Sequence, residues 1–123
     1  KIDISDLRLQ CERDLRSWRL QLRQAYLRSA GEAAWMNEWF MDSISDVFPL
    51  LRAIIHLLGG DENCGNTETV LRLGALADSD LSAFSDAWRL RKSGARFDKK
   101  EVFQQFDRWE NAFRSLVEKI DAL

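Results

Sequence analysis

Apolar residues recur at intervals of three and four along almost the whole chain, and this spacing constrains the fold more than any other feature. The first series consists of Leu7, Cys11, Leu15, Trp18, Leu22 and Ala25. Residues with this spacing lie on one face of an α-helix. No stretch of useful length alternates apolar and polar residues, so we predict no β-strands. The sequence therefore predicts an all-α protein.

Residues that start and stop helices divide the chain into five predicted helices. We expect them over about 5–29, 32–58, 67–77 and 80–92, and from Asp98 onward. Ser5 and Thr67 are the expected N-caps of the first and third helices, and Asp98 with Glu101 resembles a capping box. Pro49 predicts a kink or a break in the second helix. Four longer helices and one short helix predict an antiparallel four-helix bundle with one additional short helix.

The amount of apolar side chain is sufficient for one domain spanning residues 1–123. Apolar residues make up 46% of the chain, including five Trp and seven Phe, so a core can form without a metal or a disulfide. The second predicted helix is apolar over more than half of its circumference, so we expect it to be central. Other residues predicted to face inward include Trp35, Trp39, Leu71, Leu76, Trp88, Phe106 and Trp109.

The charge balance and the cysteines exclude several classes of function. With 18 basic and 20 acidic residues the net charge is −2, whereas domains that bind nucleic acid directly usually carry a basic excess. Cys11 and Cys64 lack the spacing of a zinc site, and we expect reduced thiols in a cytoplasmic protein. No apolar run reaches the ~18–20 residues of a membrane span, so no membrane partner is expected. The chain begins at Lys1 without Met, and we expect it to be a piece of a longer protein.

One flank of the first predicted helix carries four arginines. Arg8, Arg16, Arg19 and Arg23 fall within about 80° of one another at ~100° per residue. One interpretation is a solvated face with ion pairs, because Glu12 lies four residues from both Arg8 and Arg16. The other is a clamp that binds the phosphate or carboxylate of a substrate or nucleotide, since the forked donors of arginine suit such groups.

A row of three leucines follows the same helix on the side opposite its apolar face. Leu9, Leu20 and Leu27 form a second apolar line, which needs a second partner. That partner is another helix of the bundle, a second copy of the chain or a further domain. We therefore predict that these leucines form a partner interface.

Residue patterns typical of catalysis are weak in this chain. His56 is its single histidine, and Arg52 precedes it with three residues between them. The helical ribonuclease class known as HEPN carries an Arg and a His separated by four to six residues, so this spacing departs from that signature. Glu38 and Asp42 lie four residues apart without a nearby histidine, so no diiron site is expected. No phosphate-binding loop or HExxH motif occurs, and we expect neither cofactor nor metal in this chain.

Four segments in the first half of the chain share a further pattern: Asp6–Glu12, Leu15–Arg16, Leu22–Leu27 and Ser43–Ala53. They resemble the helical C-terminal region of uncharacterised bacterial nucleotidyltransferase-domain proteins. The pattern is also similar to the C-terminal bundle of kanamycin nucleotidyltransferase and to the substrate-binding, HEPN-like helical partners of minimal nucleotidyltransferases. The resemblance implies that the Gly-Ser motif and the metal-binding aspartates lie in a separate α/β domain. It also implies that the helical domain packs on that domain, often dimerises and helps to form the substrate cleft.

The leading hypothesis is therefore a noncatalytic helical module that packs on a nucleotidyltransferase catalytic domain, in the same chain or another, and forms a homodimer. By this analogy the four arginines would face substrate or nucleotide, and the three leucines would contact the neighbour. The alternatives are a HEPN-type ribonuclease that uses Arg52 and His56, and a free-standing helical adaptor protein.

Overall fold

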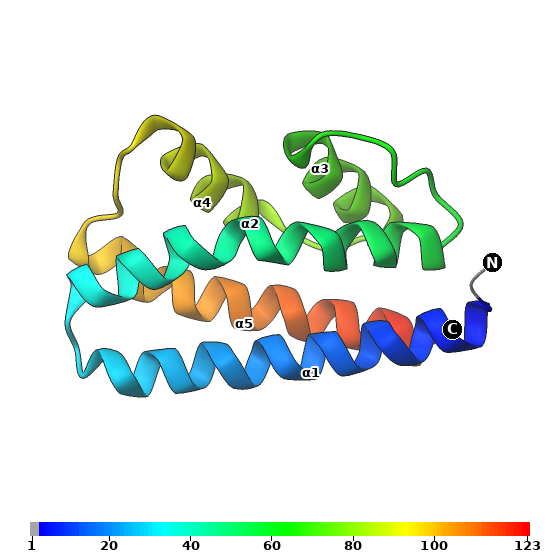
Figure 1. The fold of residues 1–123 in the computed structure, drawn as a ribbon, viewed down its shortest axis with the longest axis horizontal. Helices are drawn as coiled ribbons and strands as arrows, with labels where there is room; N and C mark the ends of the chain where they lie inside the picture. Colours follow the sequence, from blue (N-terminus) through cyan, green and yellow to red (C-terminus); the bar gives the residue numbers. More distant parts are fainter. Residues whose placement is uncertain (1–2) are drawn as a thin grey trace.

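The computed structural model describes residues 3–123, which form five α-helices and no strand (Figure 1). The helices are α1 (Ile4–Ser29), α2 (Ala33–Leu57), α3 (Asn66–Ala77), α4 (Ser82–Ser93) and α5 (Lys99–Asp121). The predicted all-α bundle is confirmed. Lys1 and Ile2, the first residues of the predicted domain, lie outside the described residues.

The central helix is α2, which packs against each of the other four helices. α1 and α5 run side by side along one side of α2, and α3 and α4 cover its other side (Figure 1). α1 is antiparallel to both α2 and α5, so the two ends of the chain lie at the same end of the bundle (Figure 1). Consistent with this, an Nη1 of Arg8 donates a hydrogen bond of 3.3 Å to the carbonyl of Leu123.

The core joins the inward faces of all five helices. Leu15 and Leu22 of α1 are fully buried, as predicted. Trp109 of α5 is also fully buried, and its ring centroid lies 4.9 Å from that of Phe40 and 5.0 Å from that of Phe84. Its indole nitrogen donates to Gln105 at 3.0 Å. The buried indole N–H therefore has an acceptor, as buried polar groups in native proteins usually do.

Three residues predicted to face inward are instead exposed. Trp35 is 40% exposed, Leu71 62% and Leu76 41%. The short helix α3 contacts its neighbours along one line only, where Val70 and Leu73 are buried. Leu71 follows Val70 by one position, about 100° around the helix, so it points to solvent. Three other aromatic residues of the predicted set, Trp39, Trp88 and Phe106, pack partly buried against the core.

Two predicted N-caps are wrong by two residues. The side chain of Asp3, not Ser5, caps α1 by accepting a hydrogen bond of 2.8 Å from the amide of Ser5. The cap of α3 is Gly65 rather than Thr67. In contrast, Asp98 and Glu101 form the predicted capping box at the start of α5. A local motif with two reciprocal hydrogen bonds is thus easier to locate than a single polar residue near a helix start.

Pro49 does not break α2, which continues as one helix from Ala33 to Leu57. A proline inside a helix removes one backbone donor. Packing against four other helices compensates for that loss, because most helical stability in proteins comes from tertiary contacts. The predicted break at Pro49 is therefore wrong, and the kink, the other predicted outcome, stays a prediction.

Candidate functional site

The arginine flank of α1 divides into two groups in the structure. Arg19 and Arg23 both bind Glu110 of α5, with Nη2 to Oε1 distances of 2.9 Å and 2.8 Å. Arg19 adds a second hydrogen bond from Nε, at 3.2 Å from the same oxygen. These contacts join the middle of α1 to the middle of α5. They are the ion pairs of a structural contact between helices.

The carboxylate of Glu110 is nearly buried, with 10% of its side chain exposed. Burial alone would raise its pKa, but the hydrogen bonds from Arg23 and Arg19 and their charges outweigh that effect, so the pKa of Glu110 lies below its ordinary value. All three hydrogen bonds reach Oε1, while the buried Oε2 has no partner. Glu110 therefore remains ionised at neutral pH and holds both arginines toward α5.

Arg8 and Arg16 lie nearer the start of α1 and do not reach Glu110. Arg8 pairs with Glu12 at 3.1 Å, as the spacing predicted. Arg16 instead donates from Nε to the backbone carbonyl of Glu12 at 3.4 Å. The predicted ion pair with Glu12 is confirmed for Arg8 but not for Arg16, and the pairing of Arg19 and Arg23 with Glu110 was not predicted. That the flank binds a substrate or a nucleotide stays a prediction.

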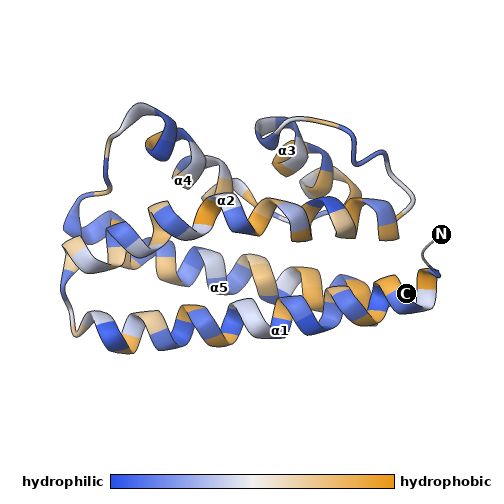
Figure 2. Cartoon of the chain, viewed as in Figure 1, coloured by the Kyte–Doolittle hydropathy of each residue, from blue (hydrophilic) through white to orange (hydrophobic). Residues whose placement is uncertain are grey.

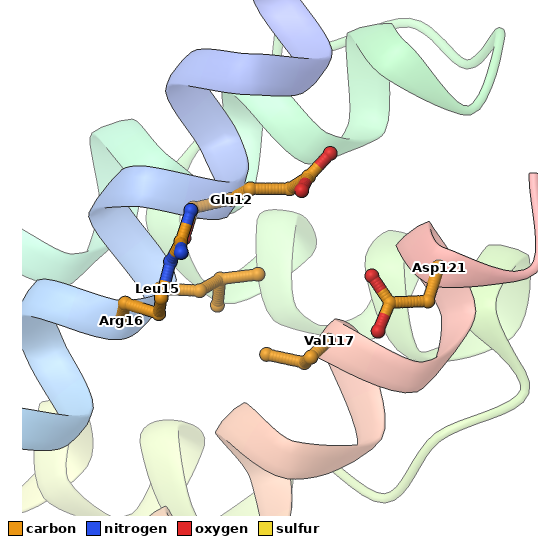
Figure 3. Close-up of a pocket in the computed structure, with 5 residues that line it drawn as sticks. All are labelled: Glu12, Leu15, Arg16, Val117 and Asp121. Atoms are coloured by element: carbon orange, nitrogen blue, oxygen red, sulfur yellow. The ribbon is translucent and has the colours of Figure 1, made fainter.

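A small hollow opens between α1 and α5 beside Arg16 (Figure 3). It measures about 160 Å³ and is lined by Glu12, Leu15, Arg16, Val117 and Asp121. Figure 3 shows Leu15 and Val117 pointing toward each other from the two helices, with the carboxylate of Asp121 directed from α5 toward α1. The lining carries two carboxylates and one guanidinium. This mixture gives the hollow no clear preference for an anion.

The outer leucine row (Leu9, Leu20 and Leu27) is exposed to solvent. The exposed fractions are 44%, 57% and 76% respectively. No other helix among residues 3–123 covers this row, which excludes another helix of the described bundle as its partner. The hydropathy colours show apolar and hydrophilic bands alternating along α1 (Figure 2). A second copy and a further domain remain as the predicted partners.

Basic side chains lie between these leucines. Arg13, Arg16 and Arg23 are all exposed, and together with the leucine row they occupy positions 9, 13, 16, 20, 23 and 27. The intervals of four and three place all six on one seam of the helix. No carboxylate occupies these six positions. The outer face of α1 is thus both apolar and basic, although the chain as a whole carries a net charge of −2.

Arg52 and His56 face a groove that sequence reasoning did not anticipate. It measures about 600 Å³, and its lining consists of Ile4, Leu7, Pro49, Arg52, Ala53, His56 and Glu62. The side chain of His56 is 51% exposed, and its Nδ1 lies 3.2 Å from Glu62. The guanidinium of Arg52 donates to Asn66 and, at 3.4 Å, to the carbonyl of Cys64. Arg52 therefore fastens the loop between α2 and α3 to α2.

Other candidate residues have structural surroundings. Cys11 is fully buried, and burial together with the charges of Asp14 and Glu12 raises the pKa of its thiol to about 11, which makes it unreactive. Glu38 pairs with Arg96 at 2.9 Å, whereas Asp42 is exposed.

Within residues 3–123 no group of three or more His, Cys, Asp or Glu could hold a metal ion. No helix in the same part of the chain has both the length and the apolar character to cross a membrane.

Sequence reasoning did not identify Glu110 as the partner of two arginines. A signal was present, because Glu110 lies seven residues after Phe103 and seven before Val117. Positions seven apart share nearly the same side of a helix, and both flanking residues are partly buried against the core. A carboxylate in that line needs a basic partner on the neighbouring helix.

Comparisons with protein-family models, with curated proteins and with solved structures found no match to this chain.

Proposed function

We propose that this chain is a noncatalytic helical module that binds a protein partner through the outward face of α1. The observation that carries the proposal is the exposed outer leucine row, opposite the buried face of the same helix. An apolar line on an outward helix face, with no helix of the described bundle over it, supports a protein interaction site. The arginine flank is largely committed to Glu12 and Glu110, which supports a structural role for it rather than substrate binding.

The partner that the sequence resemblance implies is a nucleotidyltransferase catalytic domain, and a second copy of the chain is the other candidate. In either case α1 acts as the contact helix. α2 and α5 pack along it, and its 26 residues span about 39 Å at ~1.5 Å per residue. A rigid helix presents its side chains with little loss of conformational entropy on binding.

Replacing Leu20 and Leu27 by aspartate tests this proposal. The full chain, as wild type and as Leu20→Asp/Leu27→Asp, would be sedimented alone and with an α/β nucleotidyltransferase domain that carries the Gly-Ser motif and paired aspartates. We expect a complex with the wild type and loss of that complex in the double variant. A matched control, Gln104→Asp/Asn111→Asp, adds the same two negative charges on the outward face of α5. The proposal is wrong if the double variant assembles like the wild type.

A second candidate function is supported by one observation, that Arg52, His56 and Glu62 line the same groove. A histidine and an arginine in one groove are typical of RNA cleavage by general acid–base catalysis. The engagement of Arg52 with Asn66 and Cys64 favours a structural role instead. An RNA-cleavage assay decides between them, because activity of the wild type that is lost in His56→Ala would establish the ribonuclease.

A further inference from the structure

The chemistry of the outer seam of α1 specifies what it binds. The outer seam consists of Leu9, Arg13, Arg16, Leu20, Arg23 and Leu27. Its residues span about 27 Å of helix at ~1.5 Å per residue. The alternation of intervals of four and three is the spacing with which helices pack side by side in coiled coils. A single helix lying along α1 is therefore the occupant that matches the seam in shape.

The charges of the seam select an acidic partner. Among residues 3–123, neither Arg13 nor Arg16 forms an ion pair, and the hydrogen bond of Arg16 goes to the backbone carbonyl of Glu12. Arg23 is anchored by Glu110, yet 55% of its side chain is exposed. Arginines without an acidic neighbour are available to the carboxylates of a partner, and an anchored arginine loses less entropy when it binds one.

A second copy of α1 fits this seam poorly. In an antiparallel pair that places Leu9 against Leu27, Arg13 of one copy lies opposite Arg23 of the other. A parallel pair in register places each arginine opposite itself. Like charges in such positions disfavour pairing. A helix with leucines and glutamates at the matching positions meets no such repulsion.

We propose that the outer seam of α1 binds an amphipathic helix that carries carboxylates between its apolar residues. This inference rests on the proposed docking function and names the chemistry of the partner. The three leucines lie eleven and seven positions apart, which leaves too narrow an apolar face for a helix that lies in a membrane surface. The seam also has no aromatic side chain on which bases of a nucleic acid would stack.

Two synthetic helical peptides test the inference directly. Both have leucines at the positions that oppose Leu9, Leu20 and Leu27. One carries glutamate and the other lysine opposite Arg13, Arg16 and Arg23. Fluorescence anisotropy of the labelled peptides, titrated with the full chain at low and high salt, measures both affinities. We expect the glutamate peptide to bind at least about tenfold more tightly, with a preference that falls as salt rises.

Charge reversal in the chain provides the complementary measurement. Arg13→Glu/Arg16→Glu should lower the affinity for the glutamate peptide by about tenfold or more and raise the affinity for the lysine peptide. Lys100→Glu/Arg114→Glu reverses the same number of charges on the outward face of α5 and should leave both affinities unchanged. Circular dichroism of each variant shows whether the bundle is intact.

The outcomes separate this inference from the proposed function. If both peptides bind equally and Leu20→Asp/Leu27→Asp abolishes that binding, the outer leucine row is a docking site but the acidic partner is wrong. If neither peptide binds and the leucine variant leaves every association unchanged, both proposals fail. Tighter association with phosphatidylserine vesicles or a single-stranded RNA than with the glutamate peptide would also overturn the acidic helix as occupant.

Discussion

α1 and α5 are long helices that lie side by side against α2, yet their outward faces differ. The outward side chains of α5 are polar and exposed: Lys100, Gln104, Asp107, Asn111 and Glu118. α1 instead exposes the outer leucine row. Both helices bury an inward face in the same core. The inward face alone supplies the core, so the exposed leucines of α1 lie outside it and are what the proposed docking function accounts for.

The two helices also differ in how they hold charge. α5 contributes the nearly buried Glu110, whereas α1 contributes the two arginines that neutralise it. The carboxylate of Glu110 is nearly buried, whereas Arg23 remains half exposed. The contact therefore neutralises the charge of Glu110, while the half-exposed Arg23 contributes to the outer seam of α1.

The largest expected loss of stability comes from a substitution on the inward face of α5. Trp109→Ala removes a fully buried indole and leaves Gln105 without its hydrogen bond, so we expect a loss of about 3–5 kcal/mol in the free energy of unfolding. Asn111→Ala, on the outward face, should change it by less than about 0.5 kcal/mol. Urea unfolding followed by circular dichroism measures both. Similar losses in the two variants would contradict the assignment of inward and outward faces.

Two leucine-to-alanine substitutions on α1, one on each of its apolar faces, form a matched pair. Leu22 is fully buried and Leu20 is 57% exposed, so Leu22→Ala should cost about 2–4 kcal/mol and Leu20→Ala less than about 0.5 kcal/mol. Unfolding is measured at several protein concentrations. If Leu20→Ala destabilises the chain strongly, and more so at high concentration, the outer leucine row is buried between copies of the chain.

The charge contact between the helices gives a pH-dependent prediction. Glu110→Gln removes the ionised partner of Arg19 and Arg23, and we expect a loss of about 1–2 kcal/mol near neutral pH. The pKa of Glu110 is lowered from 4.5 by these contacts. Its stabilisation is therefore complete above about pH 4.5 and is lost as the pH falls through the lower folded value. The difference between wild type and variant should shrink in acid, and a difference independent of pH would show that the charge of Glu110 is not its source.

The smallest expected losses of stability come from removing the N-caps of α1 and α5. Asp98 takes part in a capping box, whereas Asp3 accepts one hydrogen bond from the amide of Ser5. Asp98→Ala should cost about 1 kcal/mol and Asp3→Ala about half as much. Hydrogen exchange of the amides in the first turn of each helix reports the loss locally. Equal costs would mean that the reciprocal bond from Glu101 adds nothing to the cap.

The sequence by itself determined the all-α class, the inward faces of α1 and α5, and the capping box of Asp98 with Glu101. These features follow from intervals of three and four residues or from hydrogen bonds within one turn, which depend on near neighbours alone. It also determined that Leu9, Leu20 and Leu27 share one side of α1. Their position opposite Leu15 and Leu22 is a property of helix geometry.

Only the tertiary structure decided which partners these side chains have. Glu110 lies 91 residues from Arg19 along the chain, and no local pattern reports a contact between helices so far apart. The same holds for the buried Asn37, whose side chain exchanges two hydrogen bonds of 3.0 Å with the backbone of Phe97. The exposure of Leu71 followed from the single line along which α3 meets its neighbours. Periodicity defines the faces of a helix, but the packing of the other helices determines which faces water reaches.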